Sequence, residues 1–454
     1  MTTKKIKIEN NSLLFLLLIR IIYVITTVTI LDGFWYYGGG YDIEFSLIKE
    51  VLGILVFILL GFFFRSNFYG NNFKTIVIKI LFILYYIPLN ASFSIHNQPI
   101  NYFIITNIYF FLVMFFCCEA ITIGGTKITT KSGCGFKTCN GNRQEYLIDL
   151  LNKRATRIIL FSICISCIAY KISYNGFSFA LNILSDSIYT TRESYVETMN
   201  MLDSSLLGYI VTLIMNLAGY VVPFYLYISI KKKDLFAGIV SVTCLLSIFS
   251  VNSSKSEMIF IVIVFMIAFL ENKRLLNKFS KYFEVGIFFL LLASLIIYLL
   301  TGKYDFYFLI LRREMFLPSW LDTKYYSLFE NNPKILWSQG TFLIQKLIPS
   351  VYTDSYLQMI NKSFFGGYVP SPNTGLFADA YMNFGVCGVI IYPFLLSFVL
   401  NKSEGIFQKY GPGILTVMAV KLAIHLTNVP LFRTDFVLSY FLFTFVLWLI
   451  LKIK

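Results

Sequence analysis

The chain has 454 residues, of which 57% are hydrophobic and only 14% are charged. A soluble globular protein carries about 25% charged residues and covers its core with polar surface, so this composition excludes a soluble fold, a disordered chain and a disulfide scaffold. A formal net charge of +14 would suggest a nucleic-acid partner in a soluble protein, but in a membrane protein basic residues first report topology. The composition therefore predicts a polytopic membrane protein.

Apolar segments recur along the chain at a length that can cross the hydrocarbon, which takes about 20 residues. Lipid offers no hydrogen-bond partner to the backbone, so each segment should be a helix and the fold all-α. The twelve predicted spans are 13–32, 47–65, 74–93, 101–123, 158–177, 206–230, 235–251, 258–270, 285–301, 378–400, 413–428 and 437–452.

The distribution of Lys and Arg predicts that both termini are cytoplasmic. With the N-terminus inside, and with basic residues at the ends of spans counted to the nearer side, 23 basic residues are inner and 11 are outer. Seven of those 11 lie in one long outer segment, 302–377, to which the positive-inside rule does not apply well. The positive charge is thus a topology signal, and nucleic acid is not an expected partner.

Two predicted outer segments hold much of the polar sequence between the spans. Residues 174–205 form the smaller one and residues 302–377 the larger one. Loops of this length usually carry function, and the aromatic and apolar residues of Asp305–Glu314 predict short amphipathic helices on the outer surface. The predicted organisation is spans one to nine with the smaller loop (1–301), the large outer loop (302–377) and spans ten to twelve (378–454).

Spans seven and eight are predicted to be short, about 17 and 13 residues, and they flank the polar tip Asn252–Glu257. Helices too short to cross the bilayer predict that this tip lies below the outer surface, at the floor of a cavity. Lys255 would then be an anion contact. A locally thinned bilayer is the alternative explanation.

Span eleven carries Lys421, His425 and Asn428 at positions i, i+4 and i+7, which places them on one helix face. Ionisable groups within a span normally face the protein interior or a wet cavity, and they are candidates for function. His425 could instead be a buried neutral histidine. Lys421 could instead extend towards the interface or pair with a carboxylate.

Four arginines lie in the predicted outer segments: Arg192, Arg312, Arg313 and Arg433. Guanidinium presents a planar fork of donors that stays charged and suits phosphate, so a site for a lipid pyrophosphate would draw arginines from several loops. The alternative for each is a contact with phospholipid headgroups. With two histidines in the chain and no metal or nucleotide motif, no metal and no cofactor are expected.

At this point the chain resembles the O-antigen and capsule repeat-unit polymerases, the Wzy family. The predicted topology is similar, with many spans, both ends inside and one large outer loop late in the chain. Arg313–Pro318 followed by Tyr325 and Tyr326 resembles that family's Arg-x-φ-φ-φ-Pro … Tyr-Tyr stretch. Asn373–Gly388 resembles the Gly- and aromatic-rich entry to the span after the large loop, and Asn252–Ser256 resembles the basic tip between two mid-chain spans.

The resemblance implies an enzyme of the bacterial cytoplasmic (inner) membrane that works at the outer face. It would transfer a growing glycan from undecaprenyl pyrophosphate to a sugar hydroxyl of a new lipid-linked repeat unit, extending O-antigen of lipopolysaccharide or capsular polysaccharide. Expected partners are these lipid-linked glycans and membrane lipids, and the resemblance also allows a chain-length regulator. The implied catalytic residues are Arg313, Glu314, Arg433, His425 and Asp435. The implied substrate-binding residues are Arg192, Arg312, Lys255, Lys421, Tyr325 and Tyr326.

Within that scheme, Arg313, Arg433 and Arg192 would stabilise the leaving pyrophosphate, with Arg312 in reserve. Glu314, Asp435 or His425 would accept the proton of the acceptor hydroxyl, and Glu314 is preferred. Three other functions remain open. An O-antigen ligase would use a different acceptor, a lipid-linked oligosaccharide flippase or other transporter would perform no chemistry on the glycan, and a sensor or scaffold would need a soluble domain that the chain lacks.

Overall fold

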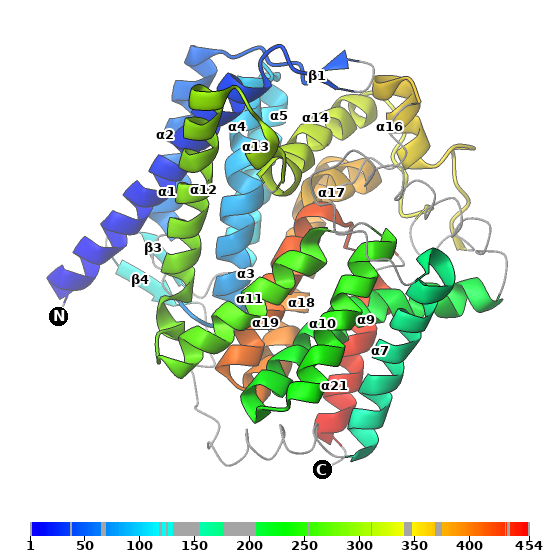
Figure 1. Ribbon diagram of the computed structural model, residues 1–454. Helices are drawn as coiled ribbons and strands as arrows, with labels where there is room; N and C mark the ends of the chain where they lie inside the picture. The colour runs from blue at the N-terminus through cyan, green and yellow to red at the C-terminus, as the bar shows by residue number, and fades with distance from the viewer. Residues whose placement is uncertain are drawn as a thin grey trace. The chain divides into compact units, whose positions relative to one another are not determined.

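The computed structural model of the chain is mainly helical (Figure 1). It describes residues 2–36, 39–64, 70–117, 120–123, 126–129, 154–176, 206–252, 255–309, 311–339, 347–367, 375–431, 433 and 436–452. Two short antiparallel hairpins pair strand β1 (Trp35–Tyr36) with β2 (Gly39–Gly40) and β3 (Ala120–Ile123) with β4 (Thr126–Thr129).

The chain forms two compact units. Unit 1 consists of Met1–Gly135, Ser280–Lys402 and Ala423–Arg433, and unit 2 consists of Phe136–Phe279, Ser403–Leu422 and Thr434–Lys454. Each unit combines segments that are far apart in the sequence.

Seven of the described helical segments are long and apolar enough to cross a membrane. They are Ser12–Leu31, Leu47–Phe64, Phe73–Ile95, Ile100–Cys117, Leu213–Lys232, Leu276–Thr301 and Val386–Tyr410. The shorter apolar helices Leu235–Val251 and Ser439–Lys452 coincide with two more of the predicted spans. A multi-pass helical membrane protein is thus confirmed, and the total of twelve spans stays a prediction.

The spans of unit 1 pack around one fully buried helical segment, Phe73–Ile95. This segment begins at Asn72, whose side chain accepts the Thr75 N–H at 2.8 Å, and it contains a π-helical turn, η2 (Phe82–Tyr86). The helices of the bundle are α1 (Thr2–Leu31), α2 (Leu47–Phe64), α3 (Phe73–Leu81), α4 (Ile87–Ile95), α5 (Ile100–Cys117), α12 (Phe279–Thr301) and α18 (Val386–Phe407, in unit 1 up to Lys402).

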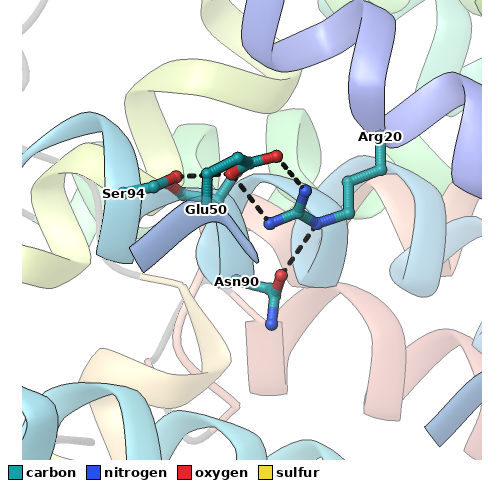
Figure 2. A network of polar contacts seen from close by, with 5 residues as sticks. Arg20, Glu50, Asn90 and Ser94 are labelled. Carbon is teal, nitrogen blue, oxygen red and sulfur yellow. Dashed lines mark hydrogen bonds and ion pairs between the residues drawn. The ribbon is translucent and has the colours of Figure 1, made fainter. Parts of the chain in front are cut away.

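A charged network ties α1, α2 and α4 together inside this bundle (Figure 2). Arg20, fully buried, donates to both carboxylate oxygens of Glu50, and its Nε donates to Asn90 Oδ1 at 2.9 Å. Ser94 donates its hydroxyl to Glu50 Oε2 at 2.7 Å. A Cβ at Gly53 would clash with the Arg20 guanidinium, so only glycine leaves room for the arginine there. The network pairs two buried charges with each other and gives each of them a further polar partner, as burial requires.

Several helix ends of unit 1 meet at one end of the bundle. The segment between α1 and α2 pairs with the end of α4, where Glu44 donates its N–H to Ile95 O at 2.8 Å and Ser46 donates to Ser94 O at 2.9 Å. Phe34, just after α1, packs against Tyr304, just after α12, with ring centroids 4.9 Å apart. The predicted large loop therefore starts from this end of the bundle.

The described part of the predicted loop 302–377 contains short helices, as predicted, and the last of them extends into the span predicted at 378–400. The helices are α13 (Asp305–Leu309), the π-helical turn η4 (Arg312–Phe316), α14 (Leu317–Glu330), α16 (Tyr356–Phe365) and α17 (Leu376–Phe384). The prediction that they all lie on the surface was wrong for α14, because its aromatic side chains pack against α4 and α17. This helix is part of the core of unit 1.

Three predicted boundaries were also wrong. The span predicted at 378–400 begins at Val386, because Gly385, with φ of 57°, ends α17 and starts a new helix. The span predicted at 101–123 ends at Cys117 and is followed by β3. The span predicted at 258–270 is an 18-residue helix, α11 (Lys255–Asn272), whose first turn includes charged residues. Helix α11 is therefore not short, and its length gives no reason to place the tip Asn252–Glu257 below the outer surface.

Unit 2 is a second helical bundle, in which α7, α9, α10 and α11 pack against one another. Its elements are α7 (Arg154–Asn175), α9 (Leu206–Lys232), α10 (Leu235–Asn252), α11, η3 (Leu276–Lys278), η5 (Gln408–Tyr410), α19 (Pro412–Asn428, in unit 2 up to Leu422), η6 (Val437–Phe441) and α21 (Leu442–Lys452). Within it, Lys421 forms a buried ion pair with Glu257 at 2.8 Å.

Candidate functional site

A pocket in unit 1 brings together the turn after α14, the helices α16 and α17, and the segment after α19. Its empty space, counted together with the open solvent at its mouth, is about 300 Å³. Its lining residues are Ile335, Trp337, Gln339, Tyr356, Asp379, Met382, Asn383, Pro430 and Arg433. Two aromatic rings, two side-chain amides, a carboxyl group and a guanidinium thus share one cavity.

Trp337 provides an aromatic wall and sits on a strained turn. Leu336 and Trp337 both have positive φ, 54° and 60°, a conformation that is costly for side chains of this size. Asn383 holds the turn, because its carbonyl oxygen accepts the Leu336 N–H at 3.1 Å and its Oδ1 accepts the Trp337 N–H at 2.8 Å. The indole N–H of Trp337 donates to the Tyr392 hydroxyl at 2.6 Å. The ring is therefore fixed through both its backbone and its side chain.

Arg433 provides a half-exposed cation on the segment after α19. Its N–H donates to Pro430 O at 3.4 Å, which folds the segment into a turn. Within the same turn, the N–H of Leu431 donates to the carboxylate of Asp379 at 3.0 Å. The position of Arg433 is thus connected to a carboxylate on α17.

Asp379 is buried in the wall of the pocket and accepts several hydrogen bonds. Leu431 donates to Oδ2, Asn383 Nδ2 donates to Oδ1 at 2.8 Å, and the Tyr392 side chain also hydrogen-bonds this carboxyl group. Burial raises the pKa of Asp379 to about 7, although these three hydrogen bonds act to lower it. The group therefore changes its charge near neutral pH.

Gln339 and Tyr356 form the remaining polar part of the wall. Gln339 Oε1 accepts the Tyr356 N–H at 2.6 Å, and Gln339 Nε2 donates to Asp354 O at 2.9 Å. Behind Tyr356 lies the ring of Tyr325, with centroids 6.2 Å apart, and Tyr325 interacts electrostatically with Arg433. Aromatic rings beside side-chain amides can bind a sugar, because the rings cover its apolar face and the amides reach its hydroxyls.

Of the predicted site residues, Arg433 lines this pocket, and Tyr325 packs against Tyr356 behind its wall. Arg312 is buried instead, where it donates to the Tyr41 hydroxyl at 2.6 Å and lies 4.6 Å from the centroid of Phe308. Arg313 is half-exposed and is not among the residues that line the pocket. Arg312 is therefore held in the core of unit 1, whereas Arg313 remains partly accessible.

Glu314, the preferred base, is buried and accepts a hydrogen bond from Asn428 Nδ2 at 3.3 Å. Tyr326 is also buried, and its hydroxyl donates to Glu330 at 3.0 Å. Neither residue lines the pocket.

Lys421 was predicted either to extend towards the interface or to pair with a carboxylate. It pairs with the carboxylate of Glu257. Its ammonium also lies 4.3 Å from the centroid of the Phe260 ring. His425 is half-buried on α19. Lys255 is the first residue of α11, and its side chain lies outside the described part of the structure, as do Arg192 and Asp435.

Asp379, Trp337 and Asn383 were not predicted as site residues from the sequence. Asp379 and Asn383 lie in the run Asn373–Gly388, which was used only for the family resemblance. A carboxylate at the entry of a predicted span is itself a signal, because such a group in a membrane segment is a candidate for function by default. Trp337 carries no comparable sequence signal.

Among the residues that the structure describes, no group of three or more His, Cys, Asp or Glu could hold a metal ion. Comparison of the chain with protein-family models, curated proteins and solved structures finds no match. The coarse description that the molecule supports is a multi-pass helical membrane protein with seven candidate spans.

Proposed function

We propose that this protein is a membrane glycosyltransferase of the repeat-unit polymerase type, which extends a glycan carried on undecaprenyl pyrophosphate at the outer face of a bacterial cytoplasmic membrane. The observation that carries the proposal is that Arg433 and Trp337 line the same pocket. A guanidinium suits a pyrophosphate, and an indole suits a sugar ring. A glycosyl pyrophosphate contains both groups within one molecule.

In this mechanism the pocket holds the donor at the bond that breaks. Arg433 stabilises the negative charge that grows on the pyrophosphate as the glycosidic bond lengthens, a contribution that is large in a site with little water. Trp337 and Tyr356 fix the adjacent sugar, and the amides of Gln339 and Asn383 lie within the same wall. A base that deprotonates the acceptor hydroxyl completes the reaction, and Glu314, His425 and Asp435 remain the proposed candidates from the sequence.

The predicted topology supports the outer location of this site. The large segment 302–377 contributes Trp337, Gln339 and Tyr356 to the pocket, and Arg433 follows from the segment after α19. Both segments are outer segments when the N-terminus is inside. Lipid-linked glycans would reach the pocket from the membrane, and a chain-length regulator could act on the same face.

Deletion of the gene, followed by complementation, tests the proposal. Deletion should leave surface glycan one repeat long, and wild-type protein should restore the full ladder. Arg433→Ala should lower the polymerisation rate by roughly 10²–10³, the usual cost of a lost charge-stabilising contact, and Arg433→Lys should recover only part of it because lysine lacks the planar fork. Lys362→Ala is a matched control, since that cation is exposed on α16 and pairs with Asp354 at 2.6 Å.

The alternative functions predict other products. A flippase deletion would leave no repeat unit at the surface, and a ligase deletion would leave polymer that stays on its lipid carrier. A full-length ladder from Arg433→Ala, at a protein level equal to wild type, would contradict the role of the pocket.

A further inference from the structure

The two functional walls of the pocket share one anchor. Asp379 Oδ2 accepts the Leu431 N–H, which fixes the turn that bears Arg433. On its other side, Asp379 is connected to Trp337 by two routes. Asn383 donates to Asp379 Oδ1 while accepting the Trp337 N–H, and Tyr392 hydrogen-bonds Asp379 while accepting the Trp337 indole N–H. One carboxylate therefore orients both the cation and the aromatic ring.

We propose that Asp379 is the positioning residue of this site, and that its ionised carboxylate sets the spacing between Arg433 and Trp337 that a glycosyl pyrophosphate requires. The positioning of a substrate rests on the proposed function, whereas the coupling of the two walls rests on the hydrogen bonds alone. Asp379 has no need to touch the reacting atoms, because donors already occupy both of its oxygens.

The hydrogen-bond partners of Asp379 favour its ionised form. Leu431 N–H and Asn383 Nδ2 are donors and cannot accept, so a carboxylate satisfies them and a protonated carboxyl group satisfies them less well. In addition, the turn at Leu336 and Trp337 has a positive φ at both residues and needs its Asn383 hydrogen bonds to persist. Loss of the carboxylate charge should therefore loosen the turn and displace Trp337.

Most titratable groups near Asp379 are tyrosine, lysine or arginine, which ordinarily titrate near pH 10 or above. They are Tyr109 on α5, Tyr325 on α14, Lys334 on the following turn, Tyr392 on α18 and Arg433. The exception is Asp322 on α14, a second buried carboxyl group whose pKa is raised to about 8. A change near neutral pH therefore points to Asp379 or Asp322, and Asp322→Asn separates the two.

Fluorescence of Trp337 tests the coupling without any substrate. Phenylalanine replaces Trp35, Trp320 and Trp448, so that Trp337 is the only tryptophan of the purified protein in detergent. Its emission should shift with a midpoint near pH 7, and Asp379→Asn should abolish this transition. Asp322→Asn is the matched control. Asp322 is also buried in unit 1, but it accepts hydrogen bonds from the Tyr85 hydroxyl and the Gly375 N–H and has no bond to the residues that line the pocket among those described. This control should keep the transition.

Binding of inorganic pyrophosphate to the same proteins, measured by calorimetry, tests the positioning. Asp379→Asn should weaken binding about 10- to 100-fold, by analogy with the loss of residues that orient the ligands of a metal ion. The exchange Asp379→Asn with Asn383→Asp should recover most of the affinity. In this double variant the amide at position 379 can accept the Leu431 N–H and donate to the carboxylate at position 383. That carboxylate can still accept the Trp337 N–H. A purely structural defect would not be rescued in this way.

Three results would overturn the inference. The first is a Trp337 fluorescence transition that persists unchanged in Asp379→Asn. The second is an exchange variant that binds pyrophosphate no more tightly than Asp379→Asn alone. The third is the absence of any transition between pH 6 and 8 in the protein with native Asp379. The last measurement needs no folded variant at position 379. Failure of the proposed function has a different signature, namely a normal Trp337 transition in a protein that does not bind pyrophosphate.

Discussion

The hydroxyl of Tyr392 accepts the indole N–H of Trp337 at 2.6 Å and so connects the first span after the pocket to the aromatic wall of the pocket. Tyr392→Phe keeps the ring and removes the hydroxyl, which accepts the indole N–H and also hydrogen-bonds Asp379. A buried donor left without a partner costs about 1–3 kcal/mol, so the Trp337 side chain should become mobile and the glycan ladder should shorten. Trp337 fluorescence anisotropy and glycan electrophoresis measure the two effects.

Tyr109→Phe is the control for that substitution. In the part of the chain that the structure describes, the Tyr109 hydroxyl is buried and has no hydrogen-bond partner, so its removal should leave the Trp337 anisotropy and the ladder unchanged. Equal effects of the two substitutions would mean that the Trp337–Tyr392 bond has no special role.

The Arg20–Glu50 pair predicts a strong asymmetry between single and double substitutions (Figure 2). Arg20→Met leaves Glu50 as an unpaired buried charge and should lower the free energy of unfolding by about 3–5 kcal/mol. The double variant Arg20→Met with Glu50→Leu should recover most of this loss, because both charges are gone. Thermal unfolding in detergent measures the difference.

The pair Lys362–Asp354 offers the exposed counterpart, with side chains 64% and 40% exposed. Lys362→Met should change stability by less than about 1 kcal/mol, since water screens such pairs. If Arg20→Met and Lys362→Met lowered the free energy of unfolding by similar amounts, burial would not determine how much an ion pair contributes to the stability of this bundle.

Asp322 predicts a pH dependence of stability. Burial raises the pKa of Asp322 to about 8, against 3.8 as the ordinary value. Between these pH values the folded state binds a proton that the unfolded state has released, so stability falls as pH rises from about 4 to about 8. Asp322→Asn should flatten the part of this slope that Asp322 causes, leaving the part due to Asp379. Unfolding temperatures from pH 4 to 9 test this, and an unchanged slope would contradict the assignment.

The predicted topology has its own test. In a variant with all eight cysteines replaced by serine, Lys362→Cys on α16 should react with a membrane-impermeant maleimide from outside the cell. Lys273→Cys, exposed just after α11, should react only after the membrane is opened. Labelling of both positions from the same side would refute the assigned orientation of the spans.

The hydropathy of the sequence was enough to predict most of the helices, because a span must be apolar over its whole length. Hydropathy gave wrong boundaries where a helix is not apolar over its whole length or where the backbone breaks inside an apolar run. The first turn of α11 contains Lys255 and Glu257, so the apolar stretch is shorter than the helix. The break at Gly385 lies inside an apolar run, and hydropathy does not register a positive φ.

The site was harder to predict because its contacts join distant parts of the sequence. Arg312 looked equivalent to Arg313, yet a hydroxyl 271 residues away, on Tyr41, distinguishes them by taking Arg312 into the core. Arg433 was chosen for its chemistry and does line the pocket. Its link to Asp379 through the backbone of Leu431 depends on the folded path of the chain, and no spacing rule contains that path.

The break between α17 and α18 has a consequence for how the pocket meets its surroundings. A single residue, Gly385, separates the helix that bears Asp379 from a helix long and apolar enough to cross a membrane, and a Cβ at Gly388 would clash with the carbonyl oxygen of Ala380. The two helices are therefore packed in direct contact where they join. If α18 spans the bilayer, the position of this helix in the membrane also fixes the depth at which the pocket lies.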